Sequence, residues 1–526
     1  MVNRLLNTIQ NWQATIAEKT HQRVSLIHVI LGIVFCFISA LYGAAMANMS
    51  SMFIFFFVAP VGLIVLWMAF SFPAYAAMLL ISFRWGFIFD AMDKSFKVQS
   101  PAVLLALLLI MVMLMRRFGP EQRKLSSDPI LWLLVIYLVY VYLGIWYAYR
   151  ESVVLVRVSD FAKDVIIAIA IANYLLSPQS FRGAIWIMIV IGGLLGTITV
   201  YQELTQTYSD NYWALAKVKI AQIVEGMDDR PRASGPLGDP NFYGQQLVTF
   251  MPLAIWAVLN AKSWGSRALA GWALIGIIAG IGLSYSRGAY LAMIVAVVMF
   301  FYYVGFNPKY LAFILPAAII AFSVAPDDLK ARFNTLSMLV PADEEDPAPQ
   351  ETSFDGRTVE MQMAVYMFLD HPFFGVAADN YKALYQVYLV QTAAGAAHGA
   401  DERNAHSYYL EVAAEHGLIG LGIVLAMMWI ANKRFAAAGK NYLAAGDRRT
   451  SDLLIALRSS YVSYLFSAIF LHGAFPRFLW LYMAMAVAVY KGSELYLAEC
   501  QAKQPAATAA NPVTEVPAQP LPQPAA

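Results

Sequence analysis

Residues 401–430 read DERNAHSYYLEVAAEHGLIGLGIVLAMMWI, so a polar segment passes without interruption into an apolar one. The apolar second half is typical of a helix inside a lipid bilayer. The first half carries His406, Glu411, Glu415 and His416, and ionisable groups are costly at membrane depth and mark functional sites by default. The stretch therefore predicts a membrane helix that begins at a functional boundary.

The composition extends this prediction to the whole chain. Of 526 residues, 60% are hydrophobic and 13% are charged, whereas about 25% of the residues of an average soluble domain are charged. Apolar runs of membrane-spanning length recur, which indicates a polytopic membrane protein. The net charge of +2 gives no sign of a nucleic-acid partner, and we expect none. Cys36 and Cys500 give neither a disulfide framework nor a metal-binding spacing. We expect no cofactor.

The hydropathy pattern predicts an all-α integral membrane protein with about 12–14 transmembrane helices and one large helical loop on the outer face. The number depends on two pairs of spans that proline interrupts at Phe72-Pro73 and Phe475-Pro476, because each is either a kinked pair or a re-entrant hairpin. The predicted spans are residues 24–46, 52–70, 73–90, 99–115, 129–149, 160–177, 183–203, 241–260, 267–284, 288–304, 308–324, 408–431, 457–474 and 478–492.

Lysine and arginine in short loops predict the orientation, because cytoplasmic loops are enriched in these residues. With all of these spans and a cytoplasmic N-terminus at residues 1–23, the most basic loops fall together on the cytoplasmic side. These loops are 116–124, 262–267 and 433–449. The same arrangement places four segments on the outer face, namely 204–240, 285–287, 325–407 and 475–477.

The outer segment 325–407 is too long for a simple connection and is predicted to fold over the membrane. It holds 13 acidic and 5 basic residues. Its part 357–376 is predicted to form an amphipathic helix that ends at His371-Pro372. The remaining divisions are a transmembrane bundle, 24–324, that includes the loop 204–240, C-terminal transmembrane helices, 408–492, and a disordered Pro/Ala-rich tail, 500–526.

Four arginines fall at the outer ends of predicted spans or in the outer loop, against the positive-inside bias. They are Arg232, Arg287, Arg357 and Arg477. A guanidinium group is always charged and matches phosphate oxygens two at a time, so several converging arginines would suit a lipid-linked diphosphate. The alternative is snorkelling, in which each arginine only lifts its charge to the interface. The residues alone leave both interpretations open.

Other polar residues surround the same predicted boundary. His406 precedes two tyrosines and is either a proton acceptor near neutral pH or an ordinary loop histidine. Glu411 and Glu415 share one helix face, and the outer arginines are the cations that we expect to pair with them. Asp239 and Asn241 are predicted to cap the following span. We assign Glu411, Glu415 and Asn241 a supporting role at the site.

Three pieces of sequence together resemble one family. They are RPRASGPLGDPN at 230–241, the Ser286-Arg287 turn, and GR…DHPFFGVAADNY…NAHSYYLEVAAEHGLIGLG at 356–422. In combination they resemble the O-antigen ligase/polymerase superfamily of bacterial membrane glycosyltransferases. The resemblance implies a multi-pass, GT-C-like protein in the inner membrane, among membrane lipids, with the active site facing the periplasm. The outer loop would then be periplasmic.

The resemblance also implies a reaction. The donor would be an undecaprenyl-diphosphate-linked glycan, and the acceptor a hydroxyl of lipid A–core, of another glycan or of a protein, with no metal involved. Carried onto this sequence, Arg232 and Arg287 would bind the diphosphate, and His406 would be the base that activates the acceptor. Arg357 and Glu415 match positions of the family signature, and we assign Arg357 to the diphosphate as well.

Several alternatives stay open at this stage. Ser407 follows His406 where many family members have asparagine, and Arg230 competes with Arg232 as the equivalent arginine. Within the family, an O-antigen or exopolysaccharide polymerase is the alternative to a ligase. A transporter or flippase for the same lipid-linked glycan is the alternative from another class. It would place arginines on both sides of the membrane midplane and often shows internal symmetry.

Overall fold

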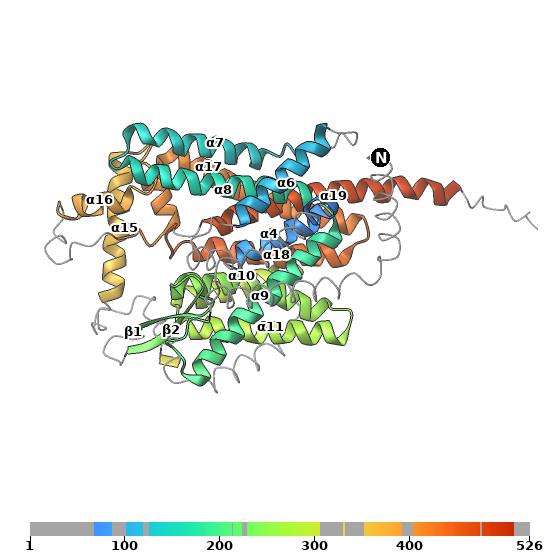
Figure 1. Cartoon of the computed structure of the whole chain (residues 1–526), viewed down its shortest axis with the longest axis horizontal. Coiled ribbons are helices and arrows are strands. Elements are labelled where there is room, and N and C mark those ends of the chain that lie inside the picture. The colour runs from blue at the N-terminus through green and yellow to red at the C-terminus, as the bar shows by residue number, and fades with distance from the viewer. Residues whose placement is uncertain are drawn as a thin grey trace, which may run out of the picture.

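A computed structural model of the chain describes residues 68–86, 101–118, 126–212, 214–222, 229–305, 330–331, 352–391, 403–473 and 476–509. In this part of the chain, long helices run side by side in a bundle (Figure 1). A two-stranded antiparallel sheet and two further helices, α15 and α16, lie at one end of it. We call this the loop end of the bundle.

The elements follow the chain in this order: α4 Pro73–Trp85, α6 Pro101–Phe118, α7 Pro129–Leu143, the 3-10 helix η1 Gly144–Tyr147, α8 Glu151–Tyr174, α9 Pro178–Thr205, β1 Lys217–Gln222, β2 Asp229–Gly235, α10 Pro240–Asn260, α11 Trp264–Leu283, α12 Arg287–Val304, α15 Thr352–Asp370, α16 Tyr381–Leu389, α17 Tyr408–Ala444, α18 Arg448–Ser467 and α19 Arg477–Ala509. The bundle helices share one large apolar core. Helices α15 and α16 pack with the first turns of α17 around a second, smaller core.

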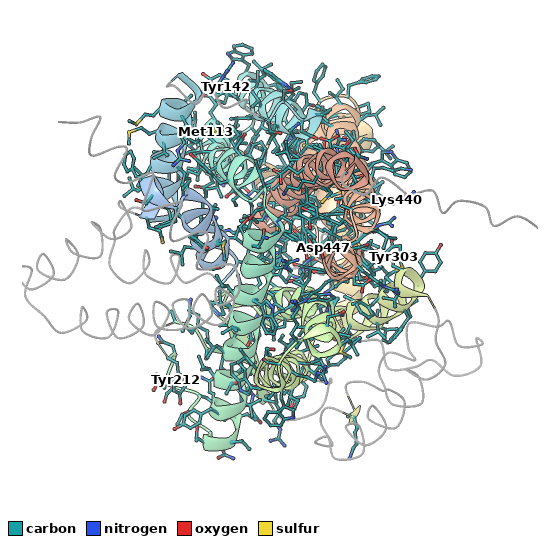
Figure 2. The ribbon with its side chains drawn as sticks, turned by 90° about the vertical axis from the view of Figure 1, so that its right-hand side faces the viewer. Met113, Tyr142, Tyr212, Tyr303, Lys440 and Asp447 are labelled. Atoms are coloured by element: carbon teal, nitrogen blue, oxygen red, sulfur yellow. The ribbon has the colours of Figure 1, made fainter. Side chains whose placement is uncertain are left out.

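Among the described residues, six helices are long and apolar enough to cross a membrane: α7 with η1, α9, α10, α11, α12 and α17. Their outward faces expose large apolar side chains, including Trp132, Ile275, Val298 and Trp429. Tyr142 also points away from the bundle (Figure 2). Apolar faces of this extent are typical of contact with lipid. The chain is therefore a multi-pass, all-α membrane protein, which confirms the predicted fold class.

Some predicted elements differ from the structure or fall outside it. The N-terminus 1–23 and the predicted spans 24–46 and 308–324 lie outside the described residues, as does most of 52–70. Helix α19 continues to Ala509, so the predicted disordered tail starts too early. Residues 500–509 include four Ala, two Gln and one Lys, and these residues favour helix once a preceding helix has nucleated it.

The β1–β2 sheet was also not predicted. β1 reads KVKIAQ, and its alternation of polar and apolar residues has the period of a strand. The run is short and lies between long apolar helices, so its periodicity is easily overlooked. The two strands pair antiparallel, with Lys219 opposite Arg232, and this pairing brings Arg232 to the loop end.

Helix α17 is interrupted where its sequence changes from polar to apolar. Gly417 adopts φ 59° and ψ −165°, so a short helix up to His416 is separated from the long apolar helix that follows. The segment 372–377 fills the gap: Val376 N–H donates to Ala414 O at 2.9 Å, and Leu418 N–H donates to Pro372 O at 2.7 Å. Glu411, Glu415 and His416 therefore belong to a short helix that packs against the segment 372–377, and the apolar span begins after them.

Helices α9 and α11 approach each other through small residues. Gly196 on α9 lies directly against Gly276 on α11, and Gly193 packs on Ala273 in the same interface. Small residues allow helix backbones in a membrane to make close contacts along their length. This packing fixes the position of α11, whose C-terminal end carries the turn at Ser284–Ser286 that leads into α12.

Gly196→Ala is expected to destabilise the protein. The added methyl group would collide with the backbone carbonyl of Gly276, which cannot rotate away, and overpacking of this kind costs about 1–3 kcal/mol. Thermal unfolding of the purified protein in detergent should show a lower Tm. Gly271→Ala is the control, since nothing lies within 4 Å of the added carbon. Equal Tm values for the two variants would contradict the close α9–α11 contact.

Candidate active site

Arg232 holds the turn between α11 and α12. From β2, its Nε and Nη2 atoms donate hydrogen bonds to the carbonyl oxygens of Ser284 and Tyr285, each at 3.2 Å. Tyr285 has a left-handed backbone, φ 49°, and Ser286 caps α12 by accepting a hydrogen bond from Ala289 N–H. Arg287 is the first residue of α12, so Arg232 stabilises the turn that presents it.

Three of the predicted arginines share one region at the loop end. Burial lowers the pKa of Arg232, and the positive charges of Arg357 and Arg287 lower it further, whereas Asp239 raises it. These side chains come from β2, α15, α12 and the loop before α10, so separate elements bring them together. Three cations and one carboxylate leave the region positive, which favours an anionic ligand.

The structure also separates Arg232 from Arg230. Arg230 is exposed on the same strand, whereas Arg232 is partly buried against the α11–α12 turn. Arg232 is thus the arginine of the RPR segment that joins the cluster.

His406 lies in the loop immediately before α17 and contacts α15. Its Nε2 atom is 3.3 Å from Glu360 Oε2, and the side chains of His406 and Glu360 are 28% and 4% exposed. The other carboxylate oxygen, Glu360 Oε1, pairs with Arg403 Nη1 at 3.2 Å. Among the described residues, the buried His406 Nδ1 atom has no hydrogen-bond partner. Glu360 thus lies beside Nε2 of His406, whereas Nδ1 is turned into the protein interior.

The backbone at His406 is left-handed, with φ 46°. Strained residues of this kind persist where surrounding contacts hold them, and they concentrate at functional sites. Here Tyr408 N–H donates to Ala468 O at 3.0 Å, and the rings of His406 and His472 meet edge to face with centroids 5.8 Å apart. The loop between α18 and α19 therefore supports the conformation of His406.

Burial lowers the pKa of His406 to about 4, with Arg357 as the next largest cause. The imidazole is therefore neutral at pH 7 and can accept a proton. The negative charge of Asp239 acts in the opposite direction and raises the pKa of both His406 and Arg232. A single carboxylate thus lies close enough to influence both the histidine and the arginine cluster.

The predicted cap of α10 is confirmed for Asp239 but is wrong for Asn241. The Asp239 carboxylate accepts hydrogen bonds from Asn241 N–H at 2.8 Å and Phe242 N–H at 3.3 Å. Asn241 is the second residue of the helix, two positions after the N-cap, so its side chain does not cap it.

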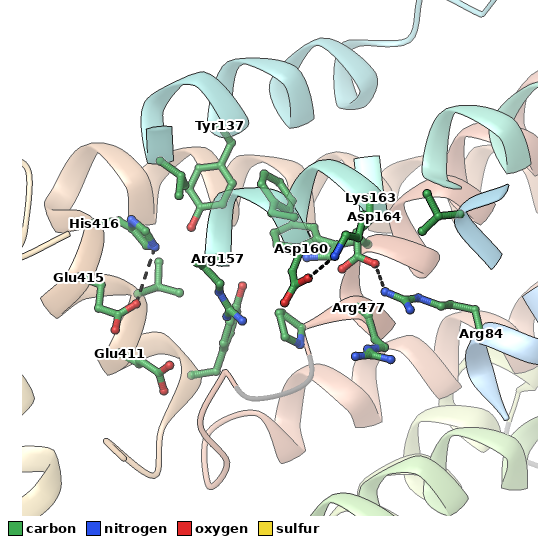
Figure 3. A pocket seen from close by; sticks show the side chains of 17 residues that line it. Arg84, Tyr137, Arg157, Asp160, Lys163, Asp164, Glu411, Glu415, His416 and Arg477 are labelled. Atoms are coloured by element: carbon green, nitrogen blue, oxygen red, sulfur yellow. Dashed lines mark hydrogen bonds and ion pairs between the residues drawn. The ribbon is translucent and has the colours of Figure 1, made fainter. Parts of the chain in front are cut away.

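Glu411 and Glu415 face a different cavity, of about 290 Å³, between α4, α8, α17 and α19 (Figure 3). Glu411 Oε2 accepts a hydrogen bond from Gly473 N–H at 2.9 Å, and Glu415 Oε1 accepts one from Tyr381 N–H at 3.3 Å. The positively charged Arg157 lies between these two carboxylates and the rest of the cavity (Figure 3). The expected pairing with Arg232, Arg287 and Arg357 is therefore wrong: backbone groups and Arg157 serve instead. Of the outer arginines, Arg477 lines this cavity.

The sequence analysis did not identify Glu360 or Arg157, although a local pattern marks each of them. Glu360 follows Arg357 by three positions, so both lie on one face of α15. Arg157, Asp160 and Asp164 likewise fall on one face of α8, as a charged stripe in an otherwise apolar helix. Within the described residues, no group of three or more His, Cys, Asp or Glu side chains could hold a metal ion.

Arg357→Gln is expected to raise the pKa of His406, because it removes a positive charge that disfavours the imidazolium. The pKa should stay below its ordinary value, since burial is the larger cause. The pH dependence of the reaction of His406 with diethyl pyrocarbonate, followed by peptide mass spectrometry, measures the neutral fraction. Arg357→Lys keeps the charge and should keep the low pKa. An unchanged titration in Arg357→Gln would show that Arg357 does not act on His406.

Comparison with known proteins gives one family. The sequence model of the family described as O-antigen ligase matches residues 247–425. This range includes Arg287, Arg357, Glu360 and His406, whereas Arg232 precedes it. No curated protein matches the chain. The match over residues 247–425 supports the resemblance to the O-antigen ligase/polymerase superfamily that the sequence motifs predicted.

Proposed function

We propose that this protein transfers a glycan from undecaprenyl diphosphate to an acceptor hydroxyl at the periplasmic face of the inner membrane. The observation that carries the proposal is the convergence of Arg232, Arg287 and Arg357 with a neutral, partly buried His406 at the loop end. The family match supports glycan transfer in general. The arrangement of the site supports the choice of a diphosphate-linked donor.

The arginines suit the leaving group of such a donor. As the bond between the sugar and the diphosphate breaks, negative charge grows on the departing oxygen, and fixed cations stabilise it without reorganising. Arg287 begins α12, so the helix N-terminus adds backbone N–H groups and a favourable dipole at the same point. Arg232 contributes charge and also fixes the turn that carries Arg287.

His406 and Glu360 suit the acceptor. The hydroxyl oxygen attacks the anomeric carbon, its proton passes to the neutral imidazole of His406, and the sugar–diphosphate bond breaks, with inversion expected at that carbon. Protonation converts His406 to an imidazolium, whose Nε2 lies 3.3 Å from Glu360 Oε2. General-base help of this type contributes typically about 10²–10⁴-fold to the rate. The sugar–diphosphate bond is already activated, so the step needs no nucleotide.

The distribution of basic residues supports a periplasmic loop end. The opposite end of the bundle, which faces the viewer in Figure 2, carries Lys440 and the α17–α18 connection with Asp447. Arg182 pairs with Asp447 at 3.0 Å, and Arg434 pairs with Asp128 at 3.0 Å. Arg448 and Arg449 come directly after Asp447 in the chain. Because basic loops stay in the cytoplasm, the site at the loop end would face outward.

The acceptor decides between a ligase and a polymerase. A ligase would use lipid A–core, and a polymerase another lipid-linked glycan. The loop segment 325–407 holds 13 acidic and 5 basic residues. This charge disfavours an anionic acceptor such as lipid A–core, so the polymerase is the second candidate. In a deletion strain, long lipid-linked polymer accumulates if a ligase is missing, and single lipid-linked repeat units accumulate if a polymerase is missing.

His406→Ala should abolish glycan transfer, because the acceptor hydroxyl would lose its base. The variant should still insert and fold, since His406 is partly exposed and lies outside the apolar spans. Complementation of the deletion strain, read as the glycan profile, measures the loss. His371→Ala is the matched control, because His371 is an exposed histidine of the same loop segment. Wild-type transfer by His406→Ala would remove this residue from the mechanism.

Arg287→Lys should also fail, although the charge is kept. Ammonium binds as a point charge and cannot hold two phosphate oxygens in one plane. Transfer by membranes that contain the variant, with added lipid-linked donor, is expected to fall at least about tenfold, as for loss of a stabilising group in the transition state. Arg230→Lys, at the exposed arginine of β2, should transfer normally. Full activity of Arg287→Lys would show that Arg287 acts only through its positive charge.

A further inference from the structure

The backbone of Gly473 is held at both its N–H and its carbonyl oxygen inside the bundle. Its N–H donates to Glu411 Oε2 at 2.9 Å, and its carbonyl oxygen accepts from Arg157 Nη2 at 2.8 Å. Arg157 comes from α8, Glu411 from α17, and Gly473 from the loop that joins α18 to α19. We call these three residues the Gly473 clamp.

The clamp leaves little space beside Gly473. A Cβ atom on Gly473 would meet Glu411 Oε1 at 3.0 Å and the Tyr408 ring at 3.2 Å. Arg157 and Glu411 line the charged cavity, where their charges also interact with each other (Figure 3). Burying such a pair is costly and rarely adds net stability over an apolar alternative. Its presence therefore calls for a role other than stability.

Gly473 of the clamp directly follows His472, whose ring supports His406. The His472 ring packs edge to face on His406, with centroids 5.8 Å apart, and on Phe242 at the start of α10, with centroids 5.0 Å apart. His472 thus fills the space between α10 and the strained backbone of His406. A shift of the Gly473 peptide would move His472 and with it the surface against which His406 rests.

We propose that Arg157 and Glu411 are positioning residues that act through Gly473 and His472 to hold the His406 imidazole in its reactive orientation. The proposal rests on the role of His406 in the proposed function. Arg157 and Glu411 touch neither donor nor acceptor in this scheme. They set the geometry of the base from the far side of α17, where a displacement of about 1 Å can cost on the order of 10²-fold in rate.

His472 gives the first test, because its two conceivable roles respond differently to substitution. If it acts by packing, His472→Phe keeps the ring and should retain kcat within about threefold, whereas His472→Ala should lower kcat at least about tenfold with little change in KM. Equal losses in both variants would make His472 a proton-transfer group and overturn the proposal. Wild-type kcat in His472→Ala would overturn it as well.

The clamp itself is tested by Arg157→Met and Arg157→Lys. The lysine variant keeps the charge beside Glu411 and one donor for the Gly473 carbonyl, so it should retain more kcat than the methionine variant. Lys163→Met is the matched control, because Lys163 lines the same cavity on the same helix and pairs with Asp160 instead. If Arg157→Met does not fold, Gly473→Ala moves the same peptide without removing a charge.

A second readout does not depend on transfer. The rate at which diethyl pyrocarbonate modifies His406 should rise in Arg157→Met, Gly473→Ala and His472→Ala, and should stay unchanged in Lys163→Met. If His406→Ala transfers glycan normally, the proposed function fails, but these rates still test the clamp. If the rates do not change while His406→Ala is inactive, the clamp fails and the proposed function stands.

Discussion

The backbone break at Gly417 is the constraint on which the site depends. At this residue the helical hydrogen-bond pattern of α17 stops, and the segment 372–377 supplies the missing partners. Gly375 lies directly against the backbone of Glu415, and Gly417 lies against that of Phe373, so neither position has space for a side chain. We call this contact between the segment 372–377 and the break at Gly417 the joint. The Tyr140 hydroxyl also belongs to it and donates a hydrogen bond to His416 O at 2.6 Å. Unpaired backbone groups at membrane depth would be strongly unfavourable, so the loop cannot leave without uncovering them.

This joint determines where the polar groups of the 401–430 stretch lie. The short helix before Gly417 belongs to both cores: its buried face packs with α15 and α16, and its carboxylates reach into the bundle. His406, at its beginning, turns toward α15 and the arginine cluster. Glu411 and Glu415, further along, turn toward Arg157. One polar segment thus serves two neighbouring sites, and the loop between α18 and α19 connects them through Gly473 and His472.

The sequence predicted those features that rest on composition or on strong local signals. The span 288–304 is apolar over its whole length and 241–260 over most of it, and α12 and α10 match them closely. The boundary position of His406 followed from the change in polarity alone. The partners of Glu411 and Glu415 could not be predicted in this way, because they are backbone groups of Gly473 and Tyr381 and a charge on α8. Such contacts depend on tertiary packing between segments that are distant in the chain, and no local periodicity encodes them.

The charges around His406 couple the two substrates in the proposed reaction. Without a donor, Arg357 and the burial of the ring keep the pKa of His406 low, so the imidazole is neutral but a weak base. A bound diphosphate would offset the positive charge of Arg357 and of the other two arginines. The pKa of His406 would then rise toward its ordinary value, and its basicity would increase only when the leaving group is in place. Glu360, fixed by Arg403 at 3.2 Å, would stabilise the imidazolium that forms. The base would therefore become effective in the donor complex, which limits proton uptake by the empty site and ties activation of the acceptor to the presence of the glycan.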